Sequence, residues 1–179
     1  LEESDLDGLS QTLRDAAARA AADRGHPGKF AITLARSSVE QFLTYSARRD
    51  LREKAFAAWI KRGEHDGPND NRPIAAETLR LRDESARMLG YETYAHFKLS
   101  DQMAKTPENV RALLEKVWTP AKAAAARDRD ELQKLAAAEG GNFEIAAHDW
   151  RYYAEKLRKA KHDIDETEIR PYLDLDAVM

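Results

Sequence analysis

Apolar residues recur three and four positions apart through most of this sequence, and that spacing constrains the fold more than any other feature. Between Ser4 and about Asp23 it is carried by Leu6, Leu9, Leu13, Ala16, Ala17 and Ala20. Side chains with this spacing share one face of an α-helix. Ala, Leu, Glu, Lys and Arg dominate, whereas the whole chain holds only 8 Gly and 6 Pro, so composition also favours helix.

Breaks in this spacing divide the chain into expected helices. They cover about 4–23, 39–47, 51–62 and 72–89, a short helix capped by Thr93, a helix from Pro107, an Ala-rich run at 121–138, and a last helix with Asp149 as its N-cap. Pro120 should kink or split the helix in which it lies. Gly90 should end the helix before it in the left-handed conformation.

The segment 29–35 is the one β-like stretch, because Phe30, Ile32 and Leu34 alternate with smaller or polar residues. That pattern suits a short strand or an extended segment. We therefore expect an all-α fold, an irregular multi-helix array with at most this one β-like segment. The length of the chain fits one domain or two small ones. No fixed-period repeat and no long linker divides it, so we expect a single helical fragment over 1–179.

Three capping boxes are expected at helix starts, where a side chain accepts from an orphan N–H and a Glu reaches back. They pair Ser37 with Glu40, Asp50 with Glu53, and Asp165 with Glu168. The N-terminus "LEESDLDGLS" lacks an initiator Met, and the closing "YLDLDAVM" resembles the start of a helix. Both ends lead us to expect an internal fragment of a longer protein.

Charge and composition exclude several classes of function. The 29 Lys and Arg against 32 Asp and Glu give a formal charge of -3, so nothing favours nucleic acid or an anionic membrane as partner. No apolar run approaches the roughly 20 residues that span a bilayer. Absence of cysteine excludes disulfides and thiolate metal sites, and it fits a reducing, cytoplasmic compartment.

No catalytic or metal-binding residue is identified from the motifs. No two histidines stand four positions apart, as a helical zinc site requires. There is no G-x-S-x-G elbow and no glycine-rich phosphate loop. The i,i+4 pairs Glu92/His96 and Glu144/His148 are expected to be solvated side-chain pairs.

The stretch "HDWRYYAEKLRKAKHD", residues 148–163, concentrates aromatic and titratable groups. Helical phasing places Trp150, Tyr153 and Leu157 on one face, which predicts core packing. Tyr152 is the aromatic residue left over, which could face a cleft or a neighbouring segment, and it is the candidate for contact with a substrate. The basic run 156–161 is expected to be a solvated helix face, with nucleic-acid binding as a minor alternative that would be sensitive to salt.

Three parts of the chain together resemble the peptidyl-dipeptidase (Dcp) branch of the thimet-oligopeptidase-like zinc metallopeptidases, which also include oligopeptidase A. They run from "FAITLARSSVEQ" to "KAFAAW", from "NDNRPI" to "KTPENV" and from "AAHDW" to "DLDAV", in collinear order over nearly the whole chain. Together, "DNRPI…LRDESARMLGY", "MAKTPENV" and "DWRYYAEK…IRPYL" are the specific motifs. The resemblance implies an almost entirely helical, two-lobed hydrolase whose channel admits short unfolded peptides. In this branch dipeptides are removed from peptide C-termini. Zinc, held by His-Glu-x-x-His and a further Glu, activates water there.

None of those catalytic residues lies in this chain, and the resemblance places the zinc segment beyond residue 179. We therefore transfer no catalytic or metal residue, and expect the chain itself to bind no zinc and to be inactive. One departure is His148, where the family pattern usually has Trp. The expected role is a channel wall and substrate-positioning surface of a peptide-degrading metalloprotease. The alternative is a stand-alone helical module for protein–protein interaction.

The expected partners follow from this interpretation. They are short unfolded peptides for the parent enzyme and the remainder of the parent chain. A fragment cut from a larger lobe should leave apolar surface uncovered. A non-native dimer of this chain, or limited solubility, is therefore expected as well.

Overall fold

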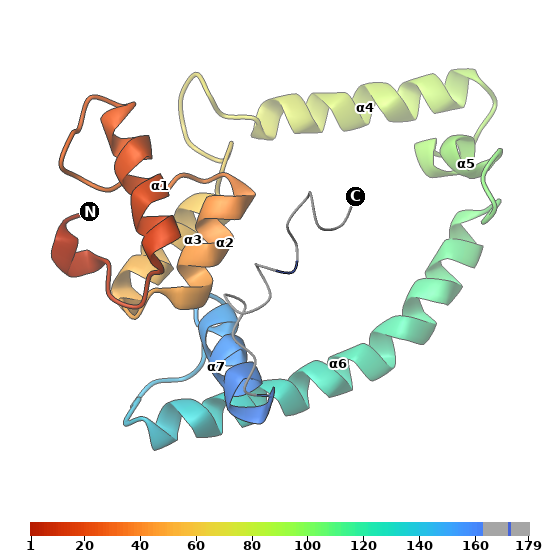
Figure 1. Cartoon of the computed structure of the whole chain (residues 1–179). Coiled ribbons are helices and arrows are strands. Elements are labelled where there is room, and N and C mark those ends of the chain that lie inside the picture. The colour runs from red at the N-terminus through yellow and green to blue at the C-terminus, as the bar shows by residue number, and fades with distance from the viewer. Residues whose placement is uncertain (163–171, 173–179) are drawn as a thin grey trace. The chain divides into compact units, whose positions relative to one another are not determined.

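The computed structural model describes residues 1–162 and residue 172, and its regular elements are all helical (Figure 1). In chain order they are the 3₁₀ turn η1 (Glu3–Asp5), α1 (Gln11–Ala22), α2 (Arg36–Tyr45), α3 (Arg49–Ile60), α4 (Arg72–Met88), α5 (Tyr94–Leu99), α6 (Pro107–Ala138) and α7 (Trp150–His162). No strand occurs among these residues. The predicted all-α class is confirmed.

The chain forms two compact units. The first unit combines Leu1–Ile60 with Arg129–Met179, and the second unit is Lys61–Asp128. Helix α6 belongs to both, because its residues up to Asp128 lie in the second unit and the rest in the first. No described helix is both long and apolar enough to cross a membrane.

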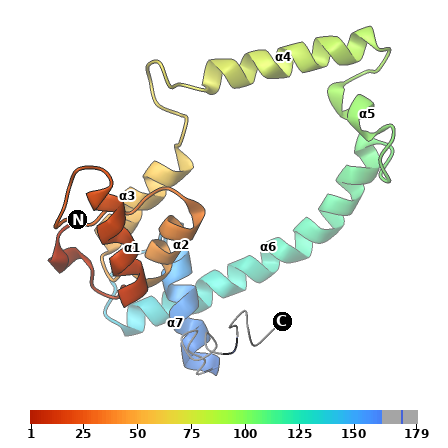
Figure 2. The ribbon, with the colours of Figure 1, turned by 45° about the horizontal axis from the view of Figure 1, so that its top comes forward.

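Helix α2 is central to the first unit, since it contacts α1, α3 and α7 (Figure 2). One core cluster lies at the N-terminal end of the sequence and consists of Leu6, Leu9, Leu13 and Phe42. A second cluster joins the end of α6 to α7 and consists of Leu132, Ala136, Ile145 and Tyr153. Residues more than a hundred positions apart therefore share this unit.

The second unit contains α4, the short α5 that packs on it, and the first part of α6. Helix α4 ends as predicted at Gly90, whose φ is 81°. The Tyr91 N–H donates to the carbonyl of Ala86 and the Gly90 N–H to that of Arg87, which is a Schellman motif. The Thr93 hydroxyl caps α5 by accepting from the His96 N–H, again as predicted.

The predicted helix over 4–23 is wrong in its first part, because the chain turns at Gly8 before α1 begins. Gly8 has a φ of 82°, and a Cβ there would lie 2.2 Å from the carbonyl oxygen of Tyr45. The turn brings Leu6 and Leu9 into the same core cluster. Helix α1 then starts after Ser10, whose side chain accepts from the Leu13 N–H.

The segment 29–35 forms no strand, so the first of the two sequence alternatives is wrong. Phe30 donates its N–H to the carbonyl of Leu1 and accepts from the terminal amine of Leu1. The Ala31 N–H donates to the carbonyl of Ala17 in α1. Because successive residues bond to different segments, no ladder forms.

The capping boxes predicted for α2 and α3 are wrong, since both helices begin earlier than expected. Helix α2 starts at Arg36 with no side-chain cap, which places Ser37 inside it. Glu40 instead forms ion pairs with Arg36 and with Arg151 of α7. Asp50 lies in the first turn of α3 and pairs with Arg48. The third predicted box, 165 with 168, lies outside the described residues.

Helix α6 is one helix of 32 residues that continues through Pro120. The sequence alternative of a split at this proline is therefore wrong. The helix ends at Ala138, where the Gly141 N–H donates to the carbonyl of Ala136 and the Gly140 N–H to that of Ala137. This second Schellman motif turns the chain into the loop that leads to α7.

Candidate functional site

The stretch 148–163 contributes its predicted aromatic face to the core of the first unit. Tyr153 is buried in the cluster formed with Leu132, Ala136 and Ile145. Trp150 and Leu157 are partly buried against the same cluster. The assignment of this face to packing is confirmed as far as His162, where the described part of the stretch ends.

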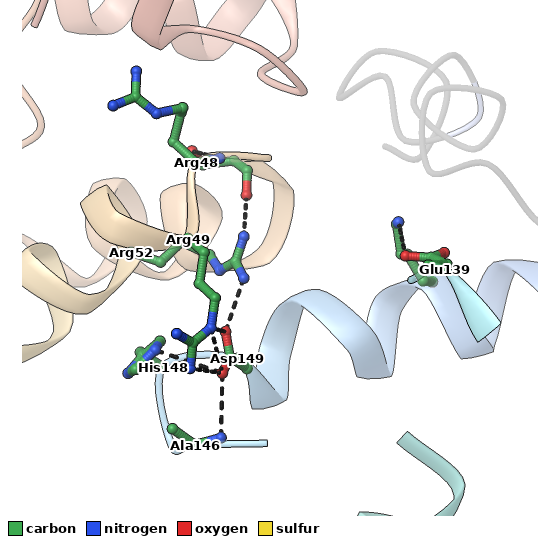
Figure 3. Close-up of polar contacts among 9 residues, drawn as sticks. Arg48, Arg49, Arg52, Glu139, Ala146, His148 and Asp149 are labelled. Atoms are coloured by element: carbon green, nitrogen blue, oxygen red, sulfur yellow. Dashed lines mark hydrogen bonds and ion pairs between the residues drawn. The ribbon is translucent and has the colours of Figure 1, made fainter. Parts of the chain in front are cut away.

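Asp149, just before α7, is the centre of a buried ion-pair cluster (Figure 3). Its Oδ1 accepts from Arg52 Nη2 at 2.9 Å, and its Oδ2 accepts from Arg49 Nη2 at 2.9 Å. Arg49 Nε lies 3.1 Å from both carboxylate oxygens. The Ala146 N–H also donates to Oδ2, at 3.2 Å. The carboxylate thus fastens α3 to the loop that precedes α7.

Burial and hydrogen bonding act on this carboxylate in opposite directions. Asp149 is fully buried and Arg52 is 1% exposed. Burial alone would raise the pKa of Asp149, but hydrogen bonds from Arg49 and Arg52 reverse this, so its pKa lies below the ordinary value. The cluster holds two positive charges against one negative charge, and the partly exposed Arg49 keeps the excess positive charge near water.

Tyr152 lies beside this cluster, half-buried, with its ring in contact with two cations. The guanidinium carbon of Arg52 is 4.1 Å and Lys156 Nζ is 4.8 Å from the ring centroid. Tyr153 meets the same ring edge-on at 5.1 Å. Lys156 in turn pairs with Glu139 at 2.7 Å. The structure therefore surrounds the one sequence-predicted substrate residue with side chains that carboxylates hold in place.

The contacts of Lys156 with Glu139 and Tyr152 also shift its pKa. Burial lowers it, while hydrogen bonds to Glu139 and Tyr152 raise it by more, so the pKa lies above the ordinary lysine value. Arg158 pairs with Glu155, and Lys161 pairs with Glu131. Three cations of the basic run 156–161 are thus already engaged by carboxylates, which weakens the reason for considering nucleic-acid binding there.

His148, the departure from the family pattern, is buried against Asp149. Its Nε2 lies 3.5 Å from Asp149 Oδ2 and is a buried nitrogen without a hydrogen-bond partner. The expected solvated helical pair of Glu144 with His148 is wrong, because both residues precede α7. The other expected pair is present, with His96 Nε2 at 3.8 Å from Glu92 Oε2.

Sequence reasoning missed the partnership of Arg49, Arg52 and Asp149. It took Asp149 only as a helix cap, and it gave the two arginines no role. Their i,i+3 spacing, which puts both on one side of a helix, was the available signal. Nothing local to α3 indicates a partner about a hundred residues away.

The arrangement positions helices and shows no acid–base constellation. The cluster holds α3 against the loop before α7, and Glu139 at the end of α6 holds Lys156 of α7. Among residues 1–162 and Tyr172, no group of three or more His, Asp or Glu side chains is placed to hold a metal ion. We assign no catalytic or metal role to any of them.

Comparison with protein families gives a match to the model of Peptidase family M3 over residues 42–179. The matched range includes all of the residues of the ion-pair cluster and Tyr152. The family resemblance inferred from the quoted motifs is thereby supported by an independent comparison.

Curated relatives include the dipeptidyl carboxypeptidases of Escherichia coli (strain K12) and Salmonella typhimurium (strain LT2). Each is 33% identical over 174 residues, which cover 97% of this chain. Oligopeptidase A of Salmonella typhimurium is 33% identical over 175 residues and 96% of the chain. The chain spans only 26% of the length of each of these relatives.

Proposed function

Because this chain belongs to Peptidase family M3, we propose that it is a helical, non-catalytic part of a zinc metallopeptidase that removes dipeptides from the C-termini of short peptides. The family match over 42–179 is the observation that carries the proposal. The dipeptidyl carboxypeptidases among the relatives support the dipeptide product. Oligopeptidase A is as similar in sequence, so the product itself has to be tested.

The zinc site belongs, in this proposal, to a segment beyond residue 179. The described side chains offer no ligand set that fits the metal, so no step of peptide hydrolysis is assigned to them. Their part is to build a wall of the peptide channel and to hold substrate-contacting groups. Two ion pairs support this positioning role, since one joins α3 to Asp149 just before α7 and the other joins Lys156 of α7 to Glu139 just after α6.

Tyr152 is the proposed peptide contact. Its ring is held by Arg52 and Lys156, and its half-buried position leaves part of the side chain accessible. A phenol can stack on a peptide and can donate a hydrogen bond from its hydroxyl. Tyr152→Phe in the longer enzyme should raise KM and leave kcat unchanged if the hydroxyl contacts the peptide equally well in the ground state and in the transition state. An unchanged KM for both Tyr152→Phe and Tyr152→Ala would remove Tyr152 from the site.

The expected compartment is the cytoplasm, where short unfolded peptides arise from protein turnover. Localisation of a tagged longer protein by fractionation tests this point. Recovery of the protein outside the cytoplasmic fraction would contradict it.

A stand-alone interaction module remains the second candidate, favoured by the exposed apolar residues of the second unit. The two candidates differ in what the reading frame encodes after Met179. A His-Glu-x-x-His motif there supports the peptidase, and a stop codon supports the module.

The experiment on the purified proteins compares this chain with the longer product of its reading frame. The chain alone should bind no stoichiometric zinc and hydrolyse no short peptide. The longer protein should do both and should lose hydrolysis when zinc is chelated. Zinc-dependent hydrolysis by the chain alone would contradict its non-catalytic role.

A further inference from the structure

Helix α6 carries an apolar face that the rest of the second unit leaves largely uncovered. Val110, Leu113, Leu114, Val117 and Trp118 recur at spacings of three and four, so they share one side of the helix. Leu113, Leu114, Val117 and Trp118 are all exposed, Trp118 by 65%, whereas Val110 is partly buried. We call these five residues the α6 face.

The second unit has little core of its own to compensate. Between Lys61 and Asp128 the only buried apolar side chain is that of Ala86. Helix α4 repeats the pattern with Ile74, Leu81 and Met88, seven positions apart and exposed. A body of this size needs a buried apolar core to be stable, and contiguous exposed stripes at core spacing mark surfaces that pack against other segments.

We propose that the α6 face is the packing surface, or seat, for an amphipathic helix. This helix would come from the part of an M3 peptidase polypeptide that this chain does not contain. This inference rests on the proposed function. The relatives align with 97% of the chain, the second unit included, and yet the aligned part is 26% of their length. Their remaining length is a source of covering segments. The five residues of the α6 face stand at positions i, i+3, i+4, i+7 and i+8, which is the spacing by which one helix packs its apolar side against an apolar groove of a partner.

The orientation of α6 in the enzyme follows from this seat. The α6 face is an internal packing surface and does not line the peptide channel. The side of α6 opposite to it carries Glu108, Glu115 and Lys116. Of the two sides of this segment, only the charged side is left to face water or a peptide.

Amide hydrogen exchange of residues 107–128 tests the seat, in this chain and in the longer product of its reading frame. We expect exchange at least ~100-fold slower in the longer protein, because covered helices open less often. Leu114→Glu should abolish that extra protection. Thr119→Glu, which adds the same charge on the opposite side of the same helix, should leave it intact.

Three outcomes would overturn the proposal. Protection already present in the dilute isolated chain, and lost in Leu114→Glu, would show that the chain covers its own face. Protection that grows with concentration of the isolated chain would identify a second copy as the occupant. Equal, fast exchange in both proteins would show that the face stays open.

The readout separates this inference from the proposed function. A longer protein that protects α6 without releasing dipeptides would keep the seat and refute the peptidase. A longer protein that releases dipeptides while α6 exchanges freely would do the reverse.

Discussion

Replacing Asp149 by Ala should destabilise the first unit more than any other single loss of an ion pair described above. The carboxylate is fully buried and accepts from Arg49, Arg52 and the Ala146 N–H. After its removal Arg52, 1% exposed, keeps its hydrogen bond to the carbonyl of Ser46 and its contact with the Tyr152 ring, but has no counterion. A buried charge left without its counterion costs about 3–5 kcal/mol.

The contribution of Arg49 to that figure is small. Its side chain is 37% exposed, so it can reach water when the carboxylate is gone. The expected loss in the free energy of unfolding is therefore about 3–5 kcal/mol, set by Arg52. Urea titration followed by far-UV circular dichroism gives this quantity from the midpoint and slope.

Two further variants make the measurement specific. Asp50→Ala removes an exposed carboxylate that pairs with Arg48 in the same region, and it should leave the urea midpoint unchanged. The double change of Asp149→Leu with Arg52→Met removes both charges and should recover at least ~2 kcal/mol relative to the sum of the single changes. A loss below ~1 kcal/mol for Asp149→Ala, or strict additivity in the double variant, would refute the assignment of a buried, coupled pair.

Three other predictions concern the same unit. The pKa of Asp149 is lower in the folded protein than in the unfolded chain, so its ionised carboxylate stabilises the fold fully above the unfolded pKa of about 4, and this stabilisation is lost as pH falls through the folded pKa. Between neutral pH and pH ~3 the urea midpoint should therefore fall more steeply in the wild type than in Asp149→Asn. Parallel curves for the two proteins would contradict this linkage. Gly25→Ala should lower the free energy of unfolding by about 1 kcal/mol because of the positive φ, since nothing lies near the added Cβ. Gly8→Ala should lower the melting temperature much further than Gly25→Ala, because its Cβ meets the carbonyl oxygen of Tyr45. Equal melting temperatures for the two variants would exclude that close approach. Tyr152→Phe keeps the ring between its cations and should change the free energy of unfolding by less than ~0.5 kcal/mol. Tyr152→Ala should lower it by about 2–3 kcal/mol in the same urea titration. Equal losses in the two variants would mean that the hydroxyl, not the ring, matters for stability.

Helical periodicity predicted most of the fold, because local spacing and end signals are sufficient for long helices. For that reason three predictions were correct: the end of α4 at Gly90, the start of α5 at Thr93, and the packed face of α7 that contains Tyr153. The chain between Ser4 and Ser10 was misread, since Leu6 and Leu9 fit a helix equally well. Only the close approach of Gly8 to Tyr45, distant in sequence, decides for a turn.

The ion-pair cluster could not be predicted, because its partners are about a hundred residues apart. Local reasoning gave Asp149 a capping role, and the buried environment that makes it a counterion is set by tertiary packing. The same limit applies to the α6 face. Its apolar residues are spaced to share one side of a helix, and four of the five are exposed, which is why we propose that another segment covers it.

The identity of the released product tests the central proposal most directly. Mass spectrometry of a short peptide with a free C-terminus, incubated with the longer protein and zinc, should show its C-terminal dipeptide. The same peptide with an amidated C-terminus should remain intact, because the proposed enzyme recognises the free carboxylate, and this chain alone should release nothing from either. Internal cleavage of both peptides at similar rates, or dipeptide release by this chain alone, would contradict the account.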